Sequence, residues 1–201
     1  MKTDRDYTLI LDKSGSMALK DQSGGRSRWA VARESAQALA AKCEELDPDG
    51  ITLYVFASRF KRYDNVTAER VTQVFLENEP CGGTDLAGVL NDAFARFFDR
   101  RRSQGKKHRP ETILVVTDGE PDDPRAVVAA IVTASRGIEQ DDELGVSLIQ
   151  VGSDPRARRY LKALDDELVH AGAPFDICDT VTLEEMEELG LSEVLVAAVN
   201  D

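Results

Sequence analysis

The hydrophobic residues of this chain gather in short runs separated by polar segments, which is typical of alternating strands and helices. Most of the runs are continuously apolar, as expected for parallel strands that are covered on both faces. The segments with strand character are Tyr7–Leu11, Ile51–Phe56, Arg59–Tyr63, Thr112–Thr117, Val146–Val151 and Phe175–Ile177.

One of these runs has a different pattern. Residues Arg59–Tyr63 alternate between polar and apolar side chains, and only Ala57 and Ser58 separate them from the preceding run. Such a connection is too short for a crossover between parallel strands. We therefore expect this segment to pair antiparallel at an edge of the sheet.

Helical periodicity fills the intervals between the strands. Apolar residues recur at spacings of three and four across 29–46 and 86–98. Two further helices should begin at Asp123-Pro124 and Asp154-Pro155, where an N-cap residue precedes a proline. The segment Thr182–Glu185 has the form of a capping box, which predicts a last helix.

This order of elements predicts an α/β fold of the doubly wound, Rossmann-like type. We expect a three-layer sandwich whose mostly parallel six-stranded sheet carries one antiparallel edge strand. The chain has 201 residues, is 42% hydrophobic and contains no stretch that resembles a linker. Residues 1–201 should therefore form a single domain.

Charge narrows the range of partners. The formal net charge of −12 disfavours non-specific binding to nucleic acid or to an anionic membrane. No apolar run is long enough to span a bilayer, and the first residues lack the core of a signal peptide, so we expect a cytoplasmic protein. Cys43, Cys81 and Cys178 are scattered and odd in number, which indicates reduced thiols. We expect Cys81 to be a small buried side chain.

Three segments place polar side chains next to predicted strand ends or helix starts. Asp12-Lys13-Ser14-Gly15-Ser16 follows the first strand, Gly82-Gly83-Thr84 precedes a helix, and Asp118-Gly119 ends the strand Thr112–Thr117. Open α/β sheets bind their ligands at the carboxyl ends of their strands. Glycines allow the first two loops to turn sharply and to approach closely. The residues therefore predict a divalent-cation site.

The donor types suit a hard cation. Mg²⁺ prefers six oxygen ligands in near-octahedral geometry and usually keeps several waters. Serine and threonine hydroxyls are neutral, so a site built on Ser14, Ser16 and Thr84 with Asp12 and Asp118 leaves much of the ion's charge uncompensated. Such an ion would attract a carboxylate from outside the chain.

These residues resemble the von Willebrand factor A domain family. The Asp-x-Ser-x-Ser loop at Asp12, the later Thr84 and the strand end at Asp118 match that family's metal-ion-dependent adhesion site. The resemblance implies that Ser14, Ser16 and Thr84 are direct ligands and that the two aspartates complete or orient the shell. It implies Mg²⁺ as cofactor, with Mn²⁺ or Ca²⁺ as alternatives.

The resemblance also implies a function. This chain resembles the stand-alone intracellular members of the family, which commonly act as metal-dependent protein interaction modules rather than enzymes. The expected partner is therefore a protein that offers an Asp or Glu carboxylate. Neighbours of the ligands would form the rim that contacts this partner. We assign the rim to Lys13, Met17, Gly83, Asp85 and Glu120.

Acidic residues next to the ligands have simpler interpretations. Asp85 should cap the helix that begins near Leu86. Glu120, Asp122 and Asp123 could bind a second ion, but a solvated acidic loop whose last member caps a helix explains them more simply.

The remaining features define alternatives. A Mg²⁺-dependent phosphohydrolase of haloacid dehalogenase type would use Asp12 as its nucleophile, but such enzymes need a second acid where this chain has Ser14. The basic connection 100–109 should lie at the opposite end of the sheet as a solvated loop, or as a second docking surface. In adhesion members of the family the last helix shifts with the metal site, so residues 192–199 are a candidate for coupling. The oligomeric state is left open.

Overall fold

A single mixed sheet forms the centre of the molecule. The computed structural model describes residues 5–47 and 49–189, and within them six strands are ordered β3-β2-β1-β4-β5-β6. Only β3 runs antiparallel to its neighbour, at one edge of the sheet. The strands are β1 (Asp6–Asp12), β2 (Ile51–Phe56), β3 (Phe60–Val66), β4 (Glu111–Thr117), β5 (Leu144–Gln150) and β6 (Cys178–Thr182). The predicted fold class is confirmed.

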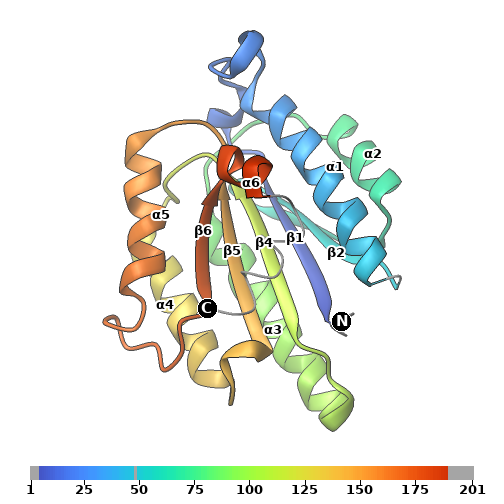
Figure 1. The fold of residues 1–201 in the computed structure, drawn as a ribbon, viewed down its shortest axis with the longest axis vertical. Helices are drawn as coiled ribbons and strands as arrows, with labels where there is room; N and C mark the ends of the chain where they lie inside the picture. Colours follow the sequence, from blue (N-terminus) through green and yellow to red (C-terminus); the bar gives the residue numbers. More distant parts are fainter. Residues whose placement is uncertain (1–4, 48, 190–201) are drawn as a thin grey trace.

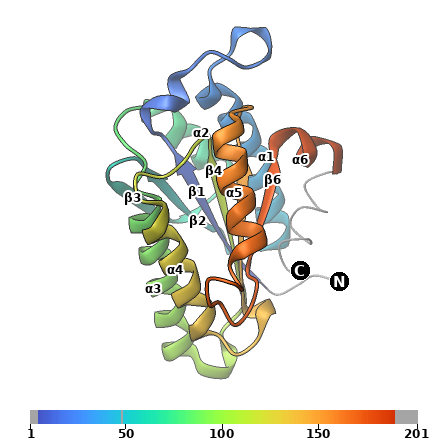
Figure 2. The same ribbon diagram turned by 90° about the vertical axis from the view of Figure 1, so that its left-hand side faces the viewer.

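Helices cover both faces of the sheet. They are α1 (Arg28–Leu46), α2 (Ala68–Leu76), α3 (Leu86–Gln104), α4 (Pro124–Gly137), α5 (Pro155–Glu167) and α6 (Leu183–Leu189). Helices α3, α4 and α5 contribute Leu90, Ile131 and Leu161 to the core on one face. Helices α1, α2 and α6 share the core on the other face. Figure 2 shows α3 and α4 on one side of the sheet and α1 and α6 on the other.

The ends of the helices follow the sequence signals. The side chains of Asp123 and Asp154 cap α4 and α5, each followed by proline in the first turn. Thr182 and Glu185 exchange hydrogen bonds at the start of α6, as a capping box requires. These predicted helix starts are confirmed, because each depends only on local chemistry.

Two elements differ from expectation. The sixth strand is Cys178–Thr182, and the predicted strand Phe175–Ile177 is wrong. The hydroxyl of Ser135 in α4 donates to the carbonyl oxygen of Phe175 at 2.8 Å and accepts from its amide at 3.0 Å, so the backbone there bonds to a helix. The true strand is polar because it lies at an edge and is only half buried.

Helix α2 is the second difference, since the sequence analysis assigns no helix there. It buries Val71, Val74 and Phe75 against the face that α1 covers. The segment 192–199, proposed above as a coupling element, lies outside the described residues.

The topology places two loops beside each other. Strands β1 and β4 are adjacent and parallel, with Leu11 opposite Val116, so both end at the same edge of the sheet. The segment between β1 and α1 begins with a short turn at Gly15–Ala18 and then projects beyond that edge (Figure 1, blue). Among the described residues, none of the helices combines the length and apolarity needed to cross a membrane.

Candidate metal centre

Asp12 ends β1 and is completely buried. Its Oδ1 accepts a hydrogen bond from the Ser14 amide at 2.7 Å, and its Oδ2 accepts one from the Thr117 hydroxyl at 2.7 Å. Burial raises the pKa of Asp12 to about 6, and the charge of Asp118 adds to this shift. All the donors to this buried carboxylate are neutral.

A chain of oxygens leads from the first loop to the third. Ser14 Oγ and Ser16 Oγ lie 3.0 Å apart, and Ser16 Oγ donates to Asp118 Oδ1 at 2.8 Å. Neighbouring ligands of an octahedral Mg²⁺ lie about 3 Å apart when each is about 2.1 Å from the ion. The distances between these oxygens therefore match the distance between neighbouring ligands in such a shell.

The backbone of Thr84 is held by the neighbouring loops. The amide of Gly15 donates to the carbonyl oxygen of Gly82 at 3.1 Å, which fastens the second loop to the first. The amide of Thr84 donates to Asp122 Oδ2 at 2.9 Å, and the Asp122 amide donates back to the Thr84 carbonyl oxygen at 2.9 Å. Asp122 thus clamps the second loop to the third, which the sequence analysis did not foresee.

Gly83 is needed for this clamp. A Cβ atom there would lie 2.5 Å from Asp122 Oδ2. The close approach predicted for the glycine pair is therefore confirmed by the position of Asp122.

Arg28 is the largest addition to the predicted site. Its Nη1 donates to Asp118 Oδ2 at 2.8 Å, while its Nη2 lies 2.5 Å from Asp21 Oδ2. The Arg28 side chain is 8% exposed and that of Asp118 is completely buried. We call Asp12, Ser14, Ser16, Arg28 and Asp118 the carboxyl-edge cluster.

One signal in the sequence could have identified Arg28. It is the first residue of α1, directly after the N-cap Ser27. A positive charge in the first turn opposes the helix dipole, so an arginine there is unfavourable unless an anionic partner lies nearby. Here Asp118 and Asp21 are those partners.

The predicted rim residues occupy different environments. Asp85 and Glu120 are exposed, and Lys13 and Gly83 are partly buried. Asp85 caps α3 by accepting from the Gly88 amide at 2.9 Å, as expected.

Met17 is completely buried in the core beside α1. It therefore offers no surface to a partner.

Cys81 also differs from expectation, because it is exposed rather than buried. Its sulfur lies 3.6 Å from Lys13 Nζ.

The basic connection lies at the opposite end of the sheet, as predicted, but its arginines are engaged in ion pairs. Arg100 pairs with the buried Glu111 and lies 3.7 Å from Asp6, and Arg109 lies 2.7 Å from Asp6. Arg109 also pairs with Asp47 and Asp49. The solvated-loop interpretation is therefore wrong for these two arginines. We call Asp6, Asp47, Asp49, Arg100, Arg109 and Glu111 the amino-edge cluster.

Apart from Arg28, the side chains of the carboxyl-edge cluster offer hard oxygen atoms as ligands. Within residues 5–47 and 49–189, no group of three or more His, Cys, Asp or Glu side chains is arranged to hold a metal ion. Hydroxyls therefore have to supply much of any shell here. The phosphohydrolase alternative is not supported: both oxygens of Asp12 are engaged, and Ser14 takes the place of the second acid.

Several solved structures share this fold. A mutant of the PilB minor pilin from Streptococcus sanguinis matches with a TM-score of 0.69 and 14% identity, over 98% of this chain and 61% of that chain. The pilus adhesin SpaC from Lactobacillus rhamnosus GG has a TM-score of 0.62 and 14% identity, over 96% of this chain and 30% of that one. Manganese-loaded TRAP protein from Plasmodium vivax has a TM-score of 0.59 and 13% identity, over 94% and 72% of the two chains.

At these identities the likeness concerns the fold alone. This chain spans less than two thirds of the pilin and of the adhesin. No curated protein matches the chain. A family model for the von Willebrand factor type A domain matches residues 7–120, which is more than half of the sequence. The chain therefore belongs to the von Willebrand factor type A domain family.

Proposed function

We propose that the oxygens of Asp12, Ser14, Ser16, Thr84 and Asp118 hold a divalent cation through which this domain binds an acidic side chain of a partner protein. Mg²⁺ is the first candidate, with Mn²⁺ and Ca²⁺ as alternatives. The observation that carries the proposal is the series of oxygens from Ser14 through Ser16 to Asp118, spaced at 3.0 and 2.8 Å. That spacing suits an octahedral shell.

The residues of the site would have different roles. A bound divalent cation would supply a positively charged coordination position that an anionic oxygen from outside can fill. Ser14, Ser16 and Thr84 would offer neutral oxygens, and Asp12 and Asp118 would complete or orient the shell. Thr117 and the Ser14 amide hold Asp12 in place, so the carboxylate is ordered before any ion binds.

The comparisons support the coarser part of this proposal. Domains of this family are generally interaction modules rather than enzymes, and a manganese-loaded relative in fold supports a divalent cation. A pilin and an adhesin among the similar structures support protein binding.

The proposed rim consists of Lys13, Gly83, Asp85 and Glu120, without the buried Met17. The net charge of −12 supports a partner that is neither a nucleic acid nor an anionic membrane. We also propose a reducing, cytoplasmic location, supported by the exposed free thiol of Cys81.

Calorimetry on the metal-stripped protein tests the proposal. We expect Mg²⁺ and Mn²⁺ to bind at one saturable site, at a salt concentration that screens the general negative charge. Ser16→Ala and Asp118→Asn should each weaken the binding by about tenfold or more, since each removes an oxygen that the cation would need.

Two matched variants serve as controls. Ser153→Ala removes an exposed serine from the loop after β5, and Asp141→Asn removes an exposed carboxylate before that strand. Both should bind the cation as the unmodified protein does. Equal cation affinity in all four variants would remove the proposed site.

A further inference from the structure

Arg28 is a buried guanidinium that joins two carboxylates of different exposure. Its Nη1 bonds to Asp118, whose side chain is completely buried, and its Nε and Nη2 bond to Asp21, whose side chain is 41% exposed. Asp118 turns its other oxygen, Oδ1, toward Ser16. One positive charge is therefore fixed directly behind a residue of the proposed metal centre.

The surrounding chain accommodates this guanidinium. Gly152 has a φ of +81°, and a Cβ atom there would lie 3.1 Å from Arg28 Nε. The hydrogen bonds to Asp21 and Asp118 raise the pKa of Arg28, so its charge is retained at all ordinary pH values. Arg28 is thus a permanent internal cation beside a site that would receive a second one.

We propose that Arg28 sets the charge of the metal centre: it weakens the binding of the cation alone and strengthens the binding of the partner's carboxylate to the loaded site. This inference rests on the proposed function. Arg28 neutralises part of the Asp118 charge, so a dication facing Asp12 and Asp118 stays net positive. A net positive centre holds its ion less tightly and attracts an external anion more strongly.

Asp21 should affect the cation affinity in the direction opposite to Arg28. It shares the guanidinium with Asp118, and hydrogen bonds from Arg28 lower the pKa of Asp21 to about 2. If Asp21 loses its charge, more of the Arg28 charge is left to act on Asp118 and on the metal centre. Asp21 and Arg28 should therefore change cation affinity in opposite directions.

The test is a calorimetric titration of Mn²⁺ into Arg28→Met, Asp21→Asn and the unmodified protein. Methionine keeps an unbranched side chain without the charge. We expect Arg28→Met to bind Mn²⁺ about tenfold more tightly and Asp21→Asn to bind it about threefold more weakly. Acetate, titrated into the Mn²⁺-saturated proteins, should bind Arg28→Met more weakly than the unmodified protein.

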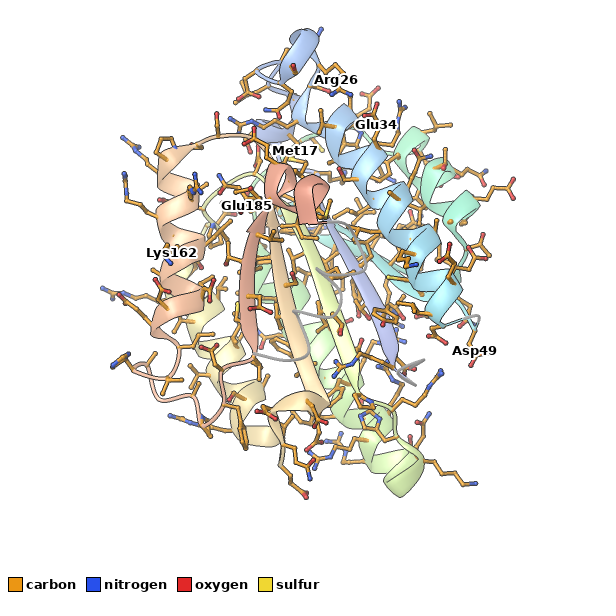
Figure 3. The ribbon with its side chains drawn as sticks, in the orientation of Figure 1. Met17, Arg26, Glu34, Asp49, Lys162 and Glu185 are labelled. Carbon is orange, nitrogen blue, oxygen red and sulfur yellow. The ribbon has the colours of Figure 1, made fainter. Side chains whose placement is uncertain are left out.

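Arg26→Met is the matched control. Arg26 lies in the projecting segment just before α1 and pairs with Glu34 of α1 at 2.7 Å, with a side chain that is 44% exposed. Figure 3 labels Arg26 and Glu34 in the upper part of the molecule. Because water screens this pair, the Mn²⁺ affinity of Arg26→Met should change by less than about twofold.

The outcomes separate this inference from the proposed function. Unchanged or weaker Mn²⁺ binding in a folded Arg28→Met protein overturns the inference while the metal site stands. If Arg28→Met fails to fold, Asp21→Asn decides, and unchanged or tighter binding there overturns it. Binding by Arg28→Met but not by the unmodified protein supports the inference and removes the proposed function. Binding by neither protein overturns both.

Discussion

Asp12 and Glu111 are two buried carboxylates at opposite ends of the same sheet. Asp12 is 0% exposed and Glu111 is 1% exposed, and burial raises the pKa of each. Their neighbours differ. Glu111 faces the guanidinium of Arg100 and accepts from the Thr8 hydroxyl at 2.5 Å. Asp12 accepts from Ser14 and from the Thr117 hydroxyl, which are neutral donors.

The charges of these two carboxylates are therefore compensated in different ways, although Asp118 at the carboxyl edge does pair with Arg28. In the amino-edge cluster the carboxylates meet arginines of the same chain, which makes that end a structural feature. In the carboxyl-edge cluster the charge of Asp12 meets no cationic side chain in the part of the chain that the structure describes. A buried carboxylate without a cation costs stability, and sites of this kind are where ligands bind. Figure 3 labels Met17 near the carboxyl edge and Asp49 at the opposite end.

The largest expected effect comes from breaking the compensated end. Arg100→Met removes the guanidinium that pairs with the buried Glu111 carboxylate and should lower the free energy of unfolding by about 3–5 kcal/mol at pH 7. The loss should shrink as the pH falls, because protonation removes the unpaired charge. Urea unfolding followed by circular dichroism measures both quantities.

Arg102→Met is the control for this change. Arg102 pairs with Asp99, and their side chains are 74% and 64% exposed. Its replacement should change the free energy of unfolding by less than about 0.5 kcal/mol. Equal losses in the two variants would contradict the structural role of the amino-edge cluster.

The next effect has the opposite sign and belongs to Asp12. Asp12→Asn keeps an acceptor for the Ser14 amide and offers a donor to Thr117, but it removes the buried charge. In the presence of a chelator, the free energy of unfolding at pH 7 should rise by about 2–3 kcal/mol, because the pKa of Asp12 is raised from 3.8 to about 6 by burial. Cation binding should be lost in the same variant.

The pH dependence follows from the direction of the shift. The pKa of Asp12 is about 6 in the folded protein, above its ordinary value of 3.8. Between these values the folded state holds a proton that the unfolded chain has released, so stability falls as the pH rises through this window. The difference between Asp12→Asn and the unmodified protein should grow from near zero at about pH 4 to its full value above about pH 6. A constant difference would contradict the assigned pKa.

The sequence predicted the parts of the site that depend on local order along the chain. Asp12 ends β1, and Ser14, Ser16 and Asp118 follow strand ends. Parallel strands bring such residues to one edge, where the structure joins them by hydrogen bonds. Arg28 could not be placed in the same way, because its partner Asp118 is distant in sequence and its position depends on how α1 packs.

The misplaced sixth strand has a related cause. Apolar runs predict buried strands, but β6 is a polar edge strand, and the backbone of the apolar Phe175 bonds to Ser135 of α4 instead. The exposure of a side chain likewise depends on tertiary packing. For this reason the expectation that Cys81 is buried is wrong. Local propensity carries no information on either point.

The smallest effect should come from the clamp between the second and third loops. Gly83→Ala places a Cβ atom where Asp122 Oδ2 lies at 2.5 Å, so that carboxylate must move and release the Thr84 amide. Losing one such bond should lower the free energy of unfolding by about 1 kcal/mol, less than either charge substitution. Cation affinity should also fall, because Thr84 is no longer held at the edge. Gly119→Ala meets no atom within 4 Å and should leave both quantities unchanged. An equal fall in affinity in both variants would show that this clamp does not position Thr84, and that the carboxyl edge depends on its charges alone.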